Sequence, residues 1–258
     1  MLKKLFYSSI KILLLVYISI CVLMYVYQDK LLYHPTPYIQ TNYQQLILHR
    51  ADADVYTYII HPKEKDAIIY FGGNDESMAV TASHLDKEFT NFACYLMDYR
   101  GYGKSTGNAT QNKLFADALA LYDKIHTKHK HIYLIGRSLG SGIATYLASK
   151  RDIKKLILIT PYDSIESVAK NRFVFLPVSF LLKDRYHSTK FVPDINASTL
   201  ILMAQKDKVI PNKHTYKLID VFKSHHKPIN VITIQNRGHN SISYDKSYYI
   251  SIKKFLKE

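Results

Sequence analysis

The sequence predicts an α/β fold in which a mostly parallel sheet is covered by helices on both faces. Eight short runs are rich in β-branched and apolar residues, as buried strands are; they occupy residues 44–50, 54–61, 66–71, 93–99, 131–136, 154–160, 198–205 and 230–236. Helix-like segments lie between or after the later runs, at 114–126, 141–150, 214–223 and 248–257. Strands that alternate with helices favour a parallel sheet. The first two runs predict an antiparallel opening pair.

The 258 residues are enough for one hydrophobic core preceded by an N-terminal appendage. Residues 1–30 predict a membrane anchor, because no residue from Ile12 to Tyr27 is charged. With Leu5 to Ser9 included and Lys11 snorkelling, the span reaches the roughly 20 residues that a bilayer needs. No small-residue cleavage pattern follows, which argues against a removed signal peptide. A linker at 31–42, rich in Pro and Tyr, leads to a domain at 43–258.

The formal net charge of +14 indicates attraction to polyanions, including a membrane surface. Lys and Arg are scattered, without a basic helical stripe, a zinc knuckle or an RNA-binding signature, so no nucleic-acid partner is expected. Lys3, Lys4 and Lys11 precede the apolar stretch, whereas only Lys30 and a histidine follow it closely. This bias predicts a cytoplasmic tail, a single-pass anchor and an extracytoplasmic domain.

Glycine marks the predicted ends of the strands. The nine glycines fall into four clusters: Gly72 and Gly73; Gly101, Gly103 and Gly107; Gly136, Gly140 and Gly142; and Gly238. In "GRSLG", Ser138 stands between a predicted strand and a predicted helix. A G-x-S-x-G turn lifts a serine hydroxyl clear of the sheet, and the helix directs the Leu139 backbone N–H to the same point. We therefore expect Ser138 to be a nucleophile and Leu139 an oxyanion donor, the alternative being an ordinary loop hydroxyl.

A serine nucleophile needs a base and an orienting carboxylate. His239 follows the last predicted strand and Asp207 the strand before it, which gives the chain order Ser, acid, His. These two residues are the predicted base and acid. Asp163, which also follows a strand in "TPYDS", and Asp184, further along the next long segment, are the rival acids.

Two further segments are expected to complete the site. In "YFGGNDES", the backbone N–H of Asn74 would supply the second oxyanion donor, the alternative being a plain glycine turn. The region near 161–195 is too long for a simple connection and predicts a small cap. Phe175 and Phe180 of this cap are the predicted substrate-binding residues, forming an apolar wall beside Ser138, unless they are core residues.

No metal or organic cofactor is expected. Cys21 and Cys94 lie in apolar runs and are interpreted as packed thiols, with no disulfide and no metal site. The sequence has no H-E-x-x-H motif, no Cys-x-x-Cys pair and no phosphate-cradling glycine loop.

The motifs "FGGN", "DYRGYGKSTG", "GRSLGSG", "TPYDS", "DKVIP" and "GHN" together resemble the membrane-anchored α/β-hydrolases related to the fungal bud-emergence protein, sometimes grouped with serine aminopeptidase-like domains. The likeness runs from the anchor and its "QDKLLYHP" exit to the C-terminus. It implies an α/β-hydrolase fold, an N-terminal anchor and a triad of Ser138, Asp207 and His239. It departs at Gly72, where many relatives have His. The stretch "DYRGYGKSTG" is interpreted as a structural loop beside the site.

The combined expectation is a membrane-tethered serine hydrolase that cleaves a carboxylic ester or thioester of a small-molecule or acyl substrate. Two alternatives stay open: a serine peptidase of the aminopeptidase type, and a non-catalytic binding protein with a hydrolase fold.

Overall fold

A single twisted sheet organises the domain, within the residues 2–257 that the computed structural model describes. The strand order is β1-β2-β4-β3-β5-β6-β7-β8, with β1, β2 and β4 paired antiparallel and the remaining pairs parallel. The strands are β1 (Gln44–Arg50), β2 (Ala53–Ile60), β3 (Asp66–Phe71), β4 (Ala93–Met97), β5 (His131–Arg137), β6 (Lys155–Ile159), β7 (Ser198–Ala204) and β8 (Ile229–Ile234). Each run expected to be a strand forms one.

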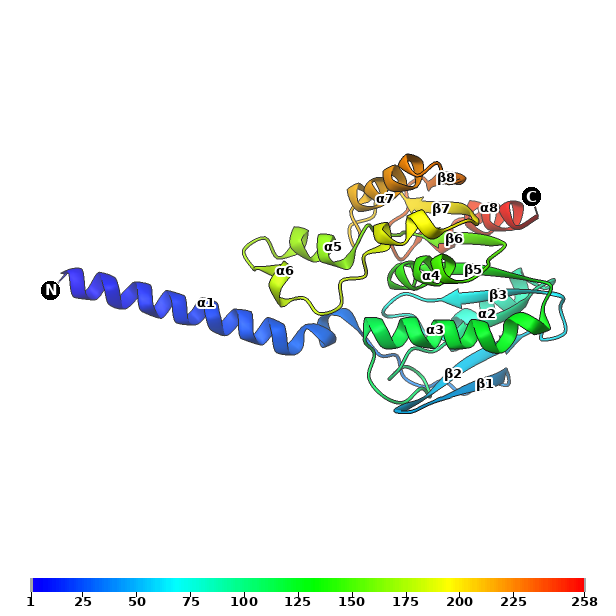
Figure 1. Ribbon diagram of the computed structural model, residues 1–258, viewed down its shortest axis with the longest axis horizontal. Helices are drawn as coiled ribbons and strands as arrows, with labels where there is room; N and C mark the ends of the chain where they lie inside the picture. Colours follow the sequence, from blue (N-terminus) through cyan, green and yellow to red (C-terminus); the bar gives the residue numbers. More distant parts are fainter. Residues whose placement is uncertain (1, 258) are drawn as a thin grey trace.

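Helices cover both faces of the sheet (Figure 1). Strand side chains alternate between two cores: Ile69 and Leu134 belong to one, and Ile68 and Ile135 to the other. The first core also holds side chains of α3 (Gln111–Ile125), α4 (Leu139–Lys150) and α7 (Asn212–Ser224). The second holds those of α2 (Met78–Glu88) and α8 (Lys246–Lys257). The predicted α/β fold, with a mostly parallel sheet between helices, is confirmed.

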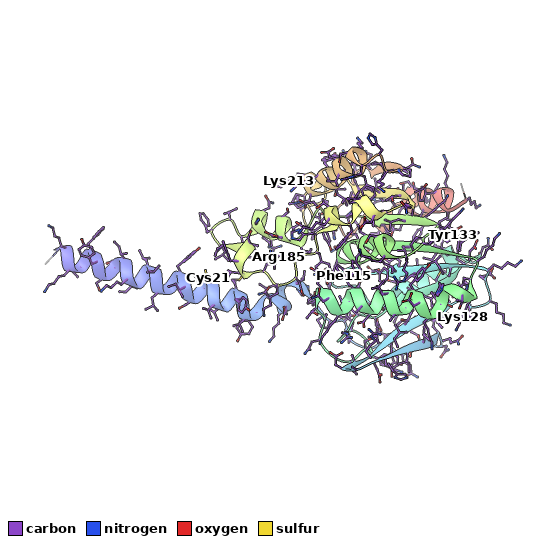
Figure 2. All side chains as sticks on the ribbon, in the orientation of Figure 1. Cys21, Phe115, Lys128, Tyr133, Arg185 and Lys213 are labelled. Atoms are coloured by element: carbon purple, nitrogen blue, oxygen red, sulfur yellow. The ribbon has the colours of Figure 1, made fainter. Side chains whose placement is uncertain are left out.

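The first helix, α1 (Leu2–Leu32), projects away from the domain (Figure 1). Its Lys3–Leu32 stretch is long and apolar enough to cross a membrane. The helix continues two residues beyond the expected boundary at residue 30. Cys21 lies on this helix, far from the sheet (Figure 2), and Cys94 is buried in β4; both are free thiols.

The long connection after β6 contains α5 (Ile165–Arg172), α6 (Val178–Leu181) and two short 3₁₀ turns, Ser188–Lys190 and Val192–Asp194. Helices α5 and α6 lie beside the C-terminal end of α1 rather than over the sheet (Figure 1). Helix α6 of the expected cap region therefore contacts α1.

The loop "DYRGYGKSTG" packs against the linker that follows α1. The Gly103 backbone N–H donates to the Thr36 carbonyl, and Gly103 pairs with Pro37 in an isolated bridge. A Cβ on Gly103 would lie 2.1 Å from Oδ2 of Asp98, so glycine alone fits beside this carboxyl group. Among the described residues no donor reaches that Oδ2, and burial raises the pKa of Asp98 to about 7.

Asp98 should make the protein less stable as the pH rises. Its folded-state pKa lies above the unfolded value, so the folded chain binds more protons between about pH 4 and pH 7, and the free energy of unfolding falls across that window. The fall attributable to this group is at most about 4 kcal/mol. When the free energy of unfolding is measured in urea at several pH values, this fall should be largely absent in Asp98→Asn. The control variant Asp194→Asn, at an exposed site, should retain the fall. Equal pH dependence in both variants would contradict this assignment.

Candidate active site

Ser138 occupies the sharp turn between β5 and α4. Its backbone has φ 51° and ψ −118°, a region that favours glycine and strains a residue with a side chain. Close packing imposes the turn: a Cβ on Gly140 would lie 2.1 Å from the Phe71 carbonyl oxygen. The Ser138 N–H donates to the Ile159 carbonyl, which ties the turn to β6. The hydroxyl thereby stands at the carboxyl edge of the sheet, with the residue 7% exposed.

His239 and Asp207 reach Ser138 from the loops after β8 and β7. His239 Nε2 lies 2.8 Å from Ser138 Oγ, and His239 Nδ1 lies 2.7 Å from Asp207 Oδ2. Because a carboxylate can only accept, Nδ1 carries the proton and Nε2 is free to accept one from Ser138. The other Asp207 oxygen accepts from the backbone N–H groups of Val209 and Ile210, at 2.9 and 2.8 Å. The carboxylate group is therefore fixed in place by donors to both of its oxygens.

The two rival acids lie elsewhere. Asp163 pairs with His214 at 2.9 Å and with Lys217 at 3.0 Å. Asp184 accepts from the hydroxyl of Tyr33 at 2.7 Å. Of the three candidate acids, Asp207 is the one that the structure places against His239.

A carboxylate that the sequence did not single out organises the loop after β3. Glu76 Oε1 accepts from Tyr70 and Thr81, at 2.8 and 2.7 Å. Its Oε2 accepts from the backbone N–H of Gly73 at 2.8 Å and lies 3.1 Å from Arg137 Nη1. The one sequence signal for Glu76 was its position in the predicted oxyanion loop. An acidic residue in a loop is normally interpreted as solvent-exposed, and its partners become known only from the structure.

The two predicted oxyanion donors flank Ser138. Leu139 is the first residue of α4, and Asn74 lines the same cavity as Ser138. A Cβ at the neighbouring Gly73 would lie 3.7 Å from the Ser138 Cβ, so this loop approaches the serine closely. The Gly73 N–H is occupied by Glu76, whereas within residues 2–257 the N–H groups of Leu139 and Asn74 donate to no other protein group.

The linker after α1 is bonded directly to Asn74. The Asn74 side-chain amide donates to the Leu32 carbonyl at 3.0 Å, and the Asn74 carbonyl accepts from the His34 N–H at 3.1 Å. The Tyr102 hydroxyl links the same groups: it donates to the Asn74 carbonyl at 2.7 Å and accepts from the His34 N–H at 2.9 Å. The end of the apolar helix is thus connected to the loop beside Ser138.

The cavity in front of Ser138 has a volume of about 440 Å³, and its lining is divided between polar groups and apolar or aromatic ones. The side chains around its wall include Glu76, His84, Arg137, Asn240, Ser243 and Tyr244. Phe175 and Phe180 do not line it; they are 86% and 87% exposed, on the segment that lies beside α1. The expectation that these two residues form an apolar wall beside Ser138 is therefore corrected: both are on the surface, and neighbouring residues such as Phe173 and Leu176 face α1.

Residues 67–189 match the protein family described as the α/β hydrolase fold. The matched range contains Ser138 and ends before Asp207 and His239, which the fold brings to the serine. The chain therefore has the α/β hydrolase fold.

Similar sequences come from distant organisms. An uncharacterised protein of Acanthamoeba polyphaga mimivirus is 29% identical over 208 residues, which cover 72% of this chain and 70% of that protein. Human alpha/beta hydrolase domain-containing protein 17B is 24% identical, with 76% and 68% covered. An uncharacterised protein of Mycobacterium tuberculosis is 28% identical over 63% of this chain, and the match spans 59% of that protein's length.

Solved structures share the fold at low identity. The Pyrococcus furiosus esterase Pf2001 superposes with a TM-score of 0.66 at 18% identity, covering 87% of this chain and 97% of that one. Mouse alpha/beta hydrolase domain-containing protein 10 gives a TM-score of 0.63 at 19% identity, covering 83% and 98%.

The strained turn gives a stability prediction that does not depend on activity. Ser138→Gly should unfold with a free energy about 1 kcal/mol higher than Ser138→Ala, because glycine adopts the turn without Cβ strain. Urea unfolding of both full-length variants in the same detergent measures this difference. If Ser138→Ala is as stable as Ser138→Gly, the turn is not strained.

Proposed function

We propose that this α/β hydrolase is a serine hydrolase that cleaves a carboxylic ester or thioester through an acyl-enzyme on Ser138. The observation that carries the proposal is the continuous hydrogen-bonded chain from Ser138 Oγ through His239 to Asp207. A serine, a base that can accept its proton and a carboxylate that orients the base are the parts that acyl transfer requires.

In the proposed first step, Ser138 Oγ attacks the substrate carbonyl carbon while its proton passes to His239 Nε2. The carbonyl oxygen becomes an oxyanion, and the Leu139 and Asn74 N–H groups would donate to it. When the tetrahedral intermediate collapses, His239 gives its proton to the departing alkoxide or thiolate, which leaves an acyl group on Ser138. Asp207 stays ionised and stabilises the imidazolium form of His239.

In the second step a water molecule replaces the leaving group. His239 takes a proton from the water as its oxygen attacks the acyl carbon, and the same two N–H groups hold the new oxyanion. Collapse releases the carboxylic acid and returns the proton to Ser138 Oγ. No metal or organic cofactor enters either step.

The lining of the cavity bears on the substrate. Glu76 and Arg137 pair at one side, and the rest of the wall combines polar groups with apolar and aromatic side chains such as Val80, Val209 and Tyr249. Such a wall suits an acyl or leaving group that has both an apolar body and polar substituents, because the wall's polar groups need partners when they lose water.

We also propose that α1 anchors the enzyme in a membrane, with the domain on the extracytoplasmic side. Beyond its length and apolarity, its C-terminal end packs into the domain: Gln28 is buried, and Tyr33, the residue that follows the helix, bonds to Asp184. A helix whose end contributes to the domain supports an uncleaved anchor rather than a removed signal.

Variants of the hydrogen-bonded chain test the catalytic proposal. Ser138→Ala should abolish hydrolysis, and Asp207→Asn should lower kcat by a factor of about 10⁴, because the imidazole loses its orienting carboxylate. Asp163→Asn is the matched control, since it alters the other buried Asp–His pair. Hydrolysis of p-nitrophenyl esters, acyl thioesters and aminoacyl amides should be measured side by side on the full-length protein.

Four outcomes would count against it. If Ser138→Ala retains activity within about tenfold of the unmodified protein, Ser138 is not the nucleophile. If Asp163→Asn lowers kcat as much as Asp207→Asn does, the assignment of Asp207 as the orienting acid is wrong. Aminoacyl amides as the sole substrates would favour the peptidase, and inactivity on every compound would favour a binding protein.

The anchor has its own test. The full-length protein should stay with membranes through a high-salt and an alkaline carbonate wash, because the apolar helix, not the basic surface, would hold it there. Release by salt alone would mean that the net charge of +14 provides the attachment.

A further inference from the structure

A second apolar surface lies beside α1. Residues 173–182, called here the 173–182 segment, follow α5 and include α6. The Tyr17 hydroxyl donates to the Phe175 carbonyl at 3.0 Å, and the Gln28 amide donates to the Leu181 carbonyl at 3.0 Å. Tyr17 and Gln28 are eleven residues apart, or about 16 Å along a helix. The segment therefore runs beside α1 over that length (Figure 1).

The 173–182 segment turns large apolar side chains outward. Val174, Phe175 and Phe180 are 68%, 86% and 87% exposed. Phenylalanines this exposed are unusual on a surface that faces water, and here they cluster beside a helix that is itself apolar.

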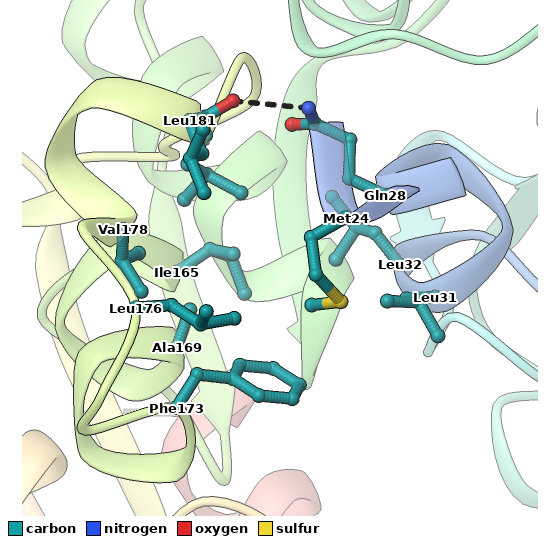
Figure 3. A pocket seen from close by; sticks show the side chains of 11 residues that line it. Met24, Gln28, Leu31, Leu32, Ile165, Ala169, Phe173, Leu176, Val178 and Leu181 are labelled. Atoms are coloured by element: carbon teal, nitrogen blue, oxygen red, sulfur yellow. Dashed lines mark hydrogen bonds between the residues drawn. The ribbon is translucent and has the colours of Figure 1, made fainter. Parts of the chain in front are cut away.

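The inner side of the segment is also apolar. A groove of about 110 Å³ separates it from α1, with Phe173 and Leu176 on one wall and Met24 and Leu31 on the other (Figure 3). Two hydrogen bonds of Gln28 close one end, to the Leu181 carbonyl and from the Lys183 N–H. Both faces of the segment therefore suit lipid chains better than water.

Basic side chains border the segment. Arg172 precedes it and Lys183 follows it, both exposed, and the half-buried Arg185 lies just beyond (Figure 2). Of the nearby acidic groups, Glu166 pairs with Lys170 and Asp184 is buried and bonded to Tyr33, whereas Asp29 on α1 is exposed. An apolar projection bordered by cations complements anionic lipid headgroups above acyl chains.

We propose that the 173–182 segment inserts into the lipid bilayer beside α1 and forms a second membrane contact, with Phe175 and Phe180 among the acyl chains. The inference rests on the proposed anchoring through α1. The segment lies level with the apolar part of that helix, so the same bilayer that surrounds α1 reaches Phe175. Two contacts would hold the domain in one orientation and fix the height of the Ser138 cavity above the membrane, which a single helix does not do.

The absence of tryptophan from the sequence makes a direct test possible. Phe175→Trp and Phe180→Trp each introduce a single tryptophan, which is excited selectively over tyrosine, into the full-length protein reconstituted in vesicles of equal parts phosphatidylcholine and phosphatidylglycerol. Leu14→Trp on α1 is the control for anchoring. Ile250→Trp is the control for water, because Ile250 is 63% exposed on α8 at the far end of the molecule from α1. Spin-labelled acyl chains quench from the lipid, and iodide quenches from the water.

The proposal expects Phe175→Trp and Phe180→Trp to follow Leu14→Trp, with lipid quenching several times that of Ile250→Trp and little quenching by iodide. If Leu14→Trp is lipid-quenched but the two segment variants behave like Ile250→Trp, insertion is wrong and the anchor stands. If Leu14→Trp escapes lipid quenching, both fail.

Shielding of the segment variants from both quenchers would mean that a protein surface, such as a second copy of the chain, covers the segment; this also overturns the proposal. Ester hydrolysis by the same variants separates this question from catalysis, because the segment does not line the Ser138 cavity.

Discussion

The close contact between the start of α4 and the end of β3 is the constraint on which the rest of the site depends. Gly140 packs against the backbone of Phe71 at a distance that admits no side chain. The chain must therefore turn abruptly at Ser138, which takes a backbone conformation that serine adopts only when its surroundings force it. The hydroxyl is raised to the carboxyl edge of the sheet, where the loops after β7 and β8 meet it. The strain at one residue is offset by the packing of a strand, a helix and a loop.

The same contact brings the β3 loop next to Ser138, and this loop is held from two directions. On the cavity side, the Glu76 carboxylate accepts from the Gly73 N–H. On the other side, the Leu32 carbonyl at the end of α1 accepts from the Asn74 side-chain amide, and the His34 N–H donates to the Asn74 carbonyl. The route from the apolar helix to the candidate oxyanion donor is therefore short and made of hydrogen bonds. Tethering and chemistry, if both proposals hold, share one structural element rather than being separate modules.

Much of the fold could be predicted from the sequence, because buried parallel strands are continuous apolar runs and the glycines mark their ends. That Ser138 and His239 meet also follows from local signals, since each lies after a strand of the same parallel sheet. The acid was harder: Asp163 and Asp207 both follow strands, and only the path of the loops decides which one reaches His239. The roles of these residues in catalysis stay predictions.

The environment of Phe175 and Phe180 was not predictable in the same way. An apolar run indicates that its side chains avoid water, but it does not indicate which surface they pack against. Here the nearest apolar surface is α1, more than a hundred residues earlier in the sequence. Glu76 was missed for a related reason, because its four partners come from three separate segments.

Covalent trapping of the full-length protein with a fluorophosphonate, followed by mass spectrometry of the digested chain, tests most directly whether Ser138 is the nucleophile. We predict one adduct, on the peptide that contains Ser138, and its loss in His239→Ala, because the serine is reactive only when the imidazole accepts its proton. An unmodified Ser138 peptide, or an adduct that forms equally well without His239, would contradict it.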